Sequence, residues 1–100
     1  MTIAYIICKD KREAQSISIH LLKKRLIACA NIFPVNSLYW WHHRIVNESE
    51  NVIIAKTNGK NFRKIVGEVK KVHSYKIPCI LNINTKANKD YEDWMKREMR

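Results

Sequence analysis

The fold is decided by residues 37–57, SLYWWHHRIVNESENVIIAKT. Ser37–Val46 is rich in aromatic and β-branched residues, which favours a strand, and Val52–Thr57 is a short apolar run typical of a buried strand. The polar residues 47–51 between these segments predict a break. Together the two segments predict an antiparallel hairpin. The strands and helices predicted before and after this hairpin then give the order of elements along the chain.

Before the hairpin, one strand and one helix are predicted. Thr2–Cys8 (TIAYIIC) is short, apolar and β-branched, as buried strands are. Asp10, followed three residues later by Glu13, resembles a capping box at the start of a helix. The helix itself is indicated by apolar residues at helical spacing, namely Ala14, Ile17, Leu21, Leu22 and Leu26.

After the hairpin, the sequence predicts a second helix, a fourth strand over Cys79–Asn84 and a terminal helix over Asp90–Met99. The second helix opens at Asn58 and Gly59. Its apolar face consists of Phe62, Ile65, Val66, Val69 and Val72, and its opposite face carries Lys60, Arg63, Lys64, Lys70 and Lys71. The class is therefore α+β, in the order β-α-β-β-α-β plus a C-terminal helix. Its simplest packing is a ferredoxin-like sheet with both helices on one face.

The second face of that sheet needs a cover. Thr2–Cys8 and Val52–Thr57 are apolar at nearly every position, although the two helices cover only one face of the predicted sheet. Either the C-terminal helix or another subunit must cover the other face. We therefore expect oligomerisation.

Composition sets further limits. A chain of 100 residues suffices for one core, so we expect a single domain over residues 1–100. The apolar content of 46% excludes intrinsic disorder in spite of a net charge of +10, and the apolar runs are too short to span a bilayer. Three widely spaced cysteines and the lack of an N-terminal signal predict a reducing compartment, the cytoplasm. The charge predicts weak attraction to polyanions that salt abolishes, with no dedicated nucleic-acid partner.

Five short motifs occur in an order and at a spacing that resemble one family. They are KKRLIACANIFP (Lys23–Pro34), SLYWWHHRI (Ser37–Ile45), AKT (Ala55–Thr57), HSYKIP (His73–Pro78) and DYEDW (Asp90–Trp94). Together they resemble the CutA divalent-cation tolerance family over nearly the whole chain. The resemblance implies a homotrimer of ferredoxin-like subunits that pack through the long hairpin. It also implies a cytoplasmic bacterial protein linked to copper and other divalent cations, with no established catalytic reaction.

The chain departs from the family pattern at several positions. Lys9 stands where the family commonly has Pro, and Cys79 replaces a Glu at the start of the last strand. His42 and His43 replace the acidic residue and the Gly of the family's hairpin turn. These changes spare the signals of the fold and remove small and acidic positions that a pocket would use.

Cys8 and His73 are the metal ligands that the resemblance implies, and Cys29 is a further candidate thiol. A thiolate and an imidazole suit copper, but two ligands from one chain make an incomplete site unless another subunit completes it. The alternative is that Cys8 and Cys29 are small buried hydrophobes and that His73 is a solvated cation at a helix end. His42 and His43, adjacent on a strand, point to opposite faces and do not predict a metal site.

Tyr39, Trp40 and Trp41 form an aromatic run on one predicted strand. Alternation places Tyr39 and Trp41 on one face and Trp40 on the other. Because a monomer of this size has difficulty burying aromatics on both faces of a hairpin, and interface cores are rich in them, we expect a subunit contact here rather than an intrachain core.

The resemblance places Glu50, Lys56 and Tyr75 near the intersubunit clefts. Lys56 ends an apolar strand and needs a partner, which Glu50 could supply across the hairpin. Such an ion pair is either structural or part of a ligand pocket, and the sequence leaves both alternatives open.

A binding or signalling module in metal tolerance is the predicted function, and a basic RNA-binding domain is the alternative. The RNA-recognition motif has the same order of elements. That motif stacks bases on its first and third strands, whereas here the first strand offers only Tyr5 and Val52–Thr57 has no aromatic residue. No enzyme is predicted, because the sequence has no Gly-rich phosphate loop, nucleophile elbow or HExxH motif.

Overall fold

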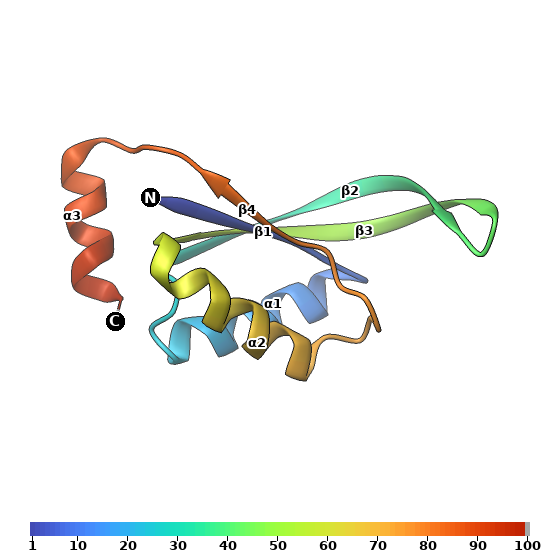
Figure 1. Cartoon of the computed structure of the whole chain (residues 1–100), viewed down its shortest axis with the longest axis horizontal. Helices are drawn as coiled ribbons and strands as arrows, with labels where there is room; N and C mark the ends of the chain where they lie inside the picture. The colour runs from blue at the N-terminus through green and yellow to red at the C-terminus, as the bar shows by residue number, and fades with distance from the viewer. Residues whose placement is uncertain (100) are drawn as a thin grey trace.

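The strands of the chain form one antiparallel sheet in the order β2-β3-β1-β4. The computed structural model describes residues 1–99. Its elements are β1 (Thr2–Cys8), α1 (Lys11–Lys23), β2 (Cys29–Trp41), β3 (Arg44–Thr57), a short 3-10 turn (Gly59–Asn61), α2 (Phe62–Val72), β4 (Ile80–Asn84) and α3 (Lys89–Glu98). Helices α1 and α2 lie on the same side of the sheet, whereas α3 stands at one end of it (Figure 1). The predicted ferredoxin-like α+β fold with an additional C-terminal helix is confirmed.

The core lies between the sheet and helices α1 and α2. In β1, alternate side chains are fully buried and those between them are half-buried, as expected for a strand with one face on a core. Ile6 on this strand packs with Ile17 and Leu21 of α1 and with Ile65 and Val69 of α2 in a single hydrophobic cluster. Helix α1 begins where the sequence predicted, since the Asp10 carboxylate accepts the backbone N–H of Glu13 at 2.8 Å.

The central hairpin is longer than predicted and turns at a different place. Strands β2 and β3 pair continuously from Cys29↔Lys56 to Trp41↔Arg44, and His42 and His43 form the turn. The expected break at residues 47–51 is therefore wrong, and the predicted strand Ser37–Val46 in fact crosses the turn. Asn47, Glu48 and Ser49 are polar because the ribbon exposes them, whereas Glu50 is buried. The turn itself lacks the Asn-Gly signal that would have revealed it. The family resemblance, in contrast, had placed the turn correctly.

Half of this hairpin projects beyond the rest of the sheet. Strand β1 ends at Cys8↔Asn51, so the seven pairs from Val35↔Glu50 to Trp41↔Arg44 extend for about 24 Å as a two-stranded ribbon. Its exposed side chains include Leu38, Trp40 and Ile45, each at least 66% exposed. An isolated two-stranded ribbon is marginally stable in water. We therefore expect another surface to cover the projecting ribbon.

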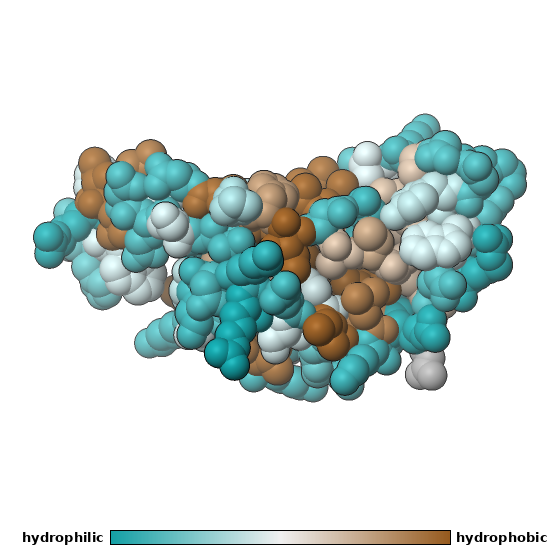
Figure 2. Space-filling view, turned by 180° about the vertical axis from the view of Figure 1, so that it is seen from behind, coloured by the Kyte–Doolittle hydropathy of each residue, from teal (hydrophilic) through white to brown (hydrophobic). Residues whose placement is uncertain are grey.

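The sheet face away from α1 and α2 is also only partly covered. Phe33, Leu81 and Ile83 remain exposed there, and α3 packs at the end of the sheet, where Met95 is buried. The space-filling view from behind shows hydrophobic groups across the middle of the molecule and at the end of the hairpin (Figure 2). Of the two alternatives for the second face, the C-terminal helix therefore leaves most of it uncovered. Within residues 1–99, no helix is long and apolar enough to cross a membrane.

Candidate functional site

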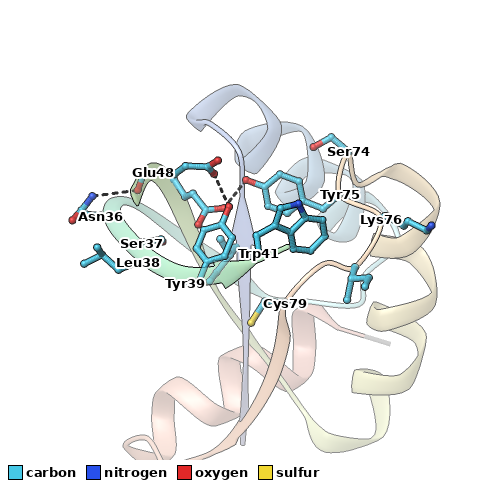
Figure 3. A pocket seen from close by; sticks show the side chains of 13 residues that line it. Asn36, Ser37, Leu38, Tyr39, Trp41, Glu48, Ser74, Tyr75, Lys76 and Cys79 are labelled. Atoms are coloured by element: carbon cyan, nitrogen blue, oxygen red, sulfur yellow. Dashed lines mark hydrogen bonds between the residues drawn. The ribbon is translucent and has the colours of Figure 1, made fainter. Parts of the chain in front are cut away.

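A cleft of about 740 Å³ opens where the projecting ribbon meets the segment that joins α2 to β4. Strands β2 and β3 contribute one wall and residues 74–79 the other. The rings of Tyr39, Trp41 and Tyr75 gather around the opening (Figure 3). Trp40, between two of them in sequence, is 70% exposed and lines no part of the cleft. The predicted alternation of the aromatic run is therefore confirmed, and the intrachain core is not where these side chains lie.

Two tyrosine–carboxylate hydrogen bonds define the polar character of the cleft. The Tyr39 hydroxyl donates to Glu48 at 2.9 Å, and the Tyr75 hydroxyl donates to Glu50 at 2.5 Å. The bond to Glu48 raises the pKa of Tyr39, whereas burial first and the bond to Glu50 second raise the pKa of Tyr75. Both hydroxyls therefore stay protonated and act as hydrogen-bond donors rather than as bases.

The predicted ion pair between Glu50 and Lys56 is wrong. Both residues lie on β3, six positions apart, which separates them by about 20 Å. Glu50 is only 4% exposed and takes its hydrogen bond from Tyr75. Lys56 instead places its ammonium 4.0 Å from the sulfur of Cys29 and 5.6 Å from the centroid of the Tyr91 ring. An aromatic face and a sulfur thus replace the expected carboxylate.

A second cluster lies where β1 ends and α1 begins. Cys8, Glu13 and His73 hold their donor atoms within 4.8 Å of one another, and they form the one such group of three within residues 1–99. Cys8 and His73 were the predicted metal ligands, and the structure does bring them together. Cys29 is not part of the group. In the sheet Cys8 lies opposite Asn51 and Cys29 opposite Lys56, and these two positions on β3 are five residues, or about 17 Å, apart.

The donor atoms of this cluster are already engaged. His73 Nε2 donates to the carbonyl of Ile7 at 2.7 Å, and its Nδ1 accepts the backbone N–H of Tyr75 at 3.0 Å. One oxygen of Glu13 accepts the N–H of Lys9 and the other accepts that of Ser74, both at 3.0 Å. The His73 side chain is fully buried, so its predicted alternative as a solvated cation is wrong.

The sulfur of Cys8 is equally unsuited to bind a cation as it stands. Burial, together with the negative charges of Glu13, Asp10 and Glu50, raises the pKa of the Cys8 thiol to about 12, whereas copper binds the thiolate. Since both nitrogens of His73 are also occupied, the three residues do not fit a ready-made metal site. They act instead as a clasp that joins the end of β1, the start of α1 and the segment after α2.

Sequence reasoning missed two members of these sites. The sequence predicts Glu13 only as part of the helix start, where its backbone N–H indeed binds Asp10. Its carboxylate in addition accepts the backbone N–H of Ser74, 61 residues away. Its hydrogen bonds outweigh burial and lower the pKa of its carboxyl group. The sequence predicts Glu48 within a polar break, whereas in the structure it accepts a hydrogen bond from Tyr39 across the ribbon. A correct hairpin register would have revealed Glu48, whereas no local signal predicts the contact of Glu13 with Ser74.

Comparison with known proteins agrees with the family resemblance of the five sequence motifs. The family model described as CutA1 divalent ion tolerance protein matches residues 2–98. A protein of Archaeoglobus fulgidus named divalent-cation tolerance protein CutA is 40% identical over 92 residues, which is 91% of this chain and 90% of that protein.

Two solved structures have the same fold over nearly their full length. CutA1 from Pyrococcus horikoshii gives a TM-score of 0.96 at 33% identity and covers 100% of this chain and 99% of its own. The structure from Archaeoglobus fulgidus, described as a periplasmic divalent cation tolerance protein, gives 0.95 at 38% identity and covers 98% of both chains. Because these relatives are archaeal and one is described as periplasmic, a bacterial source and a cytoplasmic location stay predictions. The chain belongs to the CutA1 divalent ion tolerance family.

Proposed function

We propose that this protein acts in divalent-cation tolerance as a homotrimeric binding or signalling module without catalytic activity. The observation that carries the proposal is the projecting ribbon, with its exposed Leu38, Trp40 and Ile45 beside an incompletely covered sheet. Neighbouring subunits are the simplest cover for this apolar surface, and the cleft at the root of each ribbon would then lie beside the contact. Membership of the CutA1 family supports the role in cation tolerance.

The chemistry of the cleft supports binding rather than catalysis. Its two tyrosines are held protonated by carboxylates, and the carboxylates are themselves occupied as acceptors. A catalytic acid or base needs a pKa near the working pH and an open position for substrate, which this arrangement does not supply. We propose that Trp41, Glu50 and Tyr75 shape a binding cleft at the subunit contact.

Size-exclusion chromatography with light scattering tests the assembly. We expect three times the 11.9 kDa of one chain at micromolar concentration. Trp40→Ser with Ile45→Ser changes a directly opposed, exposed pair on the ribbon and should release monomers. Ile19→Ser is the matched control, because Ile19 is 51% exposed on α1, away from the ribbon. A monomeric parent protein would contradict the proposal.

Copper remains the cation that a thiol and an imidazole would select. Because the clasp offers no free donor, we expect the folded protein to bind copper weakly, with the same isotherm for the parent and for Cys8→Ala. Titration calorimetry with cuprous and cupric ions, each in a suitable buffer, measures this. Saturation at one ion per subunit that Cys8→Ala abolishes would instead establish Cys8 as a ligand and overturn the interpretation of the clasp.

A further inference from the structure

The positive charge of the protein is concentrated on one layer. Twelve of the nineteen lysines and arginines, and only three of the nine carboxylates, lie in residues 9–25 and 59–76, which comprise α1, α2 and their flanking segments. These segments therefore hold +9 of the net +10. All twelve of these cationic side chains are exposed. The sheet and the projecting ribbon are nearly neutral by comparison.

The three carboxylates of this layer are engaged within the fold. Asp10 caps α1, and Glu13 belongs to the clasp. Glu68 is 16% exposed and accepts hydrogen bonds from His20 and Lys71, both at 2.9 Å. Lys71 keeps 70% of its side chain exposed in spite of this ion pair. The charge that the layer presents to solvent is thus almost entirely positive.

The outer face of α2 is the most cationic part of this layer. Arg63, Lys64, Lys70 and Lys71 fall on one arc of the helix, and its apolar residues Ile65 and Val69 are buried on the other side. The second cationic pair follows the first by seven positions, which places the two pairs about 10 Å apart along the helix axis. The exposed arc between Arg63 and Lys71 contains no apolar or aromatic side chain.

Gly67 occupies the centre of this arc. It is exposed and helical, its φ is not positive, and a Cβ built on it meets nothing within 4 Å. Nothing within the fold thus requires a glycine, although glycine is among the poorest helix formers. A helix surface without a side chain at its centre allows another backbone to approach closely. Gly67 therefore lies among four exposed cations, and no side chain stands above the helix backbone between them.

We propose that the outer face of α2 is a docking surface for the phosphate backbone of double-stranded nucleic acid. The phosphates of a duplex are densely and regularly spaced. Lysine and arginine neutralise them, and the release of the bound counterions drives the association. The arc has no aromatic side chain to stack on a base and no apolar side chain to enter a bilayer, which favours a duplex over single strands and over lipid. Binding of this kind is independent of nucleotide sequence, and it assigns to one helix the salt-sensitive attraction to polyanions that the overall charge predicts.

Fluorescence anisotropy with a labelled 20-bp DNA duplex tests the proposal. If all four cations contact phosphates, the affinity should fall about a hundredfold between 50 and 200 mM salt through these contacts alone. The fourfold variant Arg63→Gln, Lys64→Gln, Lys70→Gln, Lys71→Gln should lower the slope of log affinity against log salt by about 3 to 4. The twofold variant Arg63→Gln, Lys64→Gln involves no ion pair of α2 and should lower the slope by about half as much.

A matched control removes the same charge elsewhere. This control variant replaces four exposed cations of the C-terminal region, in the substitutions Lys86→Gln, Lys89→Gln, Lys96→Gln and Arg97→Gln. Its affinity and slope should stay close to those of the parent. Gly67→Leu keeps every charge and should weaken binding at each salt concentration while the slope stays the same.

Three outcomes would overturn the proposal. The first is no duplex binding by the parent at 50 mM salt. The second is an equal loss of affinity in the α2 variant and in the C-terminal control, which would assign the binding to overall charge. The third is binding of the parent to phosphatidylserine vesicles without binding to the duplex. Circular dichroism of each variant verifies that α2 is intact.

Discussion

Replacing Tyr75 by Phe removes one oxygen atom from the cleft and deprives a buried carboxylate of its hydroxyl donor. Glu50 is only 4% exposed, and the Tyr75 hydroxyl binds it at 2.5 Å. Hydrogen bonds to charged groups contribute about 1.5–3 kcal/mol to stability. Since water has little access to Glu50, we expect Tyr75→Phe to cost about 2–3 kcal/mol of the free energy of unfolding, near the upper end of that range.

A double-mutant cycle isolates the interaction. Glu50→Gln removes the charge but keeps an acceptor for the hydroxyl, and we expect it to cost about 1 kcal/mol. In the double variant no buried charge is left unpaired, so its cost should be about 2 kcal/mol, less than the sum of the two single costs. The expected coupling between Tyr75 and Glu50 is therefore about 1–2 kcal/mol.

Guanidinium unfolding at pH 7, followed by circular dichroism, measures these values. All four proteins must be compared at one protomer concentration, because the stability of an oligomer depends on it. Tyr39→Phe is the control, since it deletes the same atom from a hydroxyl bonded to the exposed Glu48 and should cost much less. Additive single effects, or equal losses for Tyr39→Phe and Tyr75→Phe, would refute the reasoning.

Three further measurements test other parts of the structure. His42 and His43 have φ values of 48° and 62°, so His42→Asn with His43→Gly should suit the turn better and add about 1–2 kcal/mol to the free energy of unfolding, seen as a higher melting temperature. Hydrogen bonds from Lys71 and His20 lower the pKa of Glu68 from 4.5 to about 2. Its stabilising effect is thus complete above pH 4.5 and lost as the pH falls toward 2; Glu68→Gln should lack this component in unfolding midpoints measured from pH 6 to pH 2. In native protein at pH 8, iodoacetamide should modify the half-exposed Cys29 well before the buried Cys8, as peptide mass spectrometry would show.

Local signals in the sequence predicted most of the fold, and they failed where the environment was unusual. The bounds of β1 and the cap at Asp10 follow from short-range patterns, and both are confirmed. The hairpin register failed because the ribbon beyond Val35↔Glu50 has neither a third strand nor a helix against it. The pattern of polar and apolar residues in a strand follows burial, so in a ribbon that is mostly exposed it no longer marks where a strand ends.

The candidate sites depended on tertiary contacts that a sequence pattern does not contain. The family resemblance brought Cys8 and His73 together correctly, but it could not show that backbone groups already occupy both nitrogens of His73. The predicted ion pair of Glu50 with Lys56 failed because it placed Glu50 in a break, across the hairpin from Lys56, whereas both residues lie on the continuous strand β3. Burial and hydrogen bonding, which decide whether a donor is free, became visible only in the folded chain.

The separation of apolar and cationic surfaces makes self-association and polyanion binding distinguishable. Contacts between helix layers of two subunits would bring +9 against +9, so repulsion disfavours them, whereas the ribbon and the open sheet face are nearly uncharged. Assembly through that apolar surface should therefore persist at high salt. Docking of a duplex on α2 should disappear over the same range, because it depends on counterion release. If salt instead dissociated the oligomer and the duplex complex over the same range, both processes would depend on one surface. The division of the molecule into an associating face and a docking face would then be wrong.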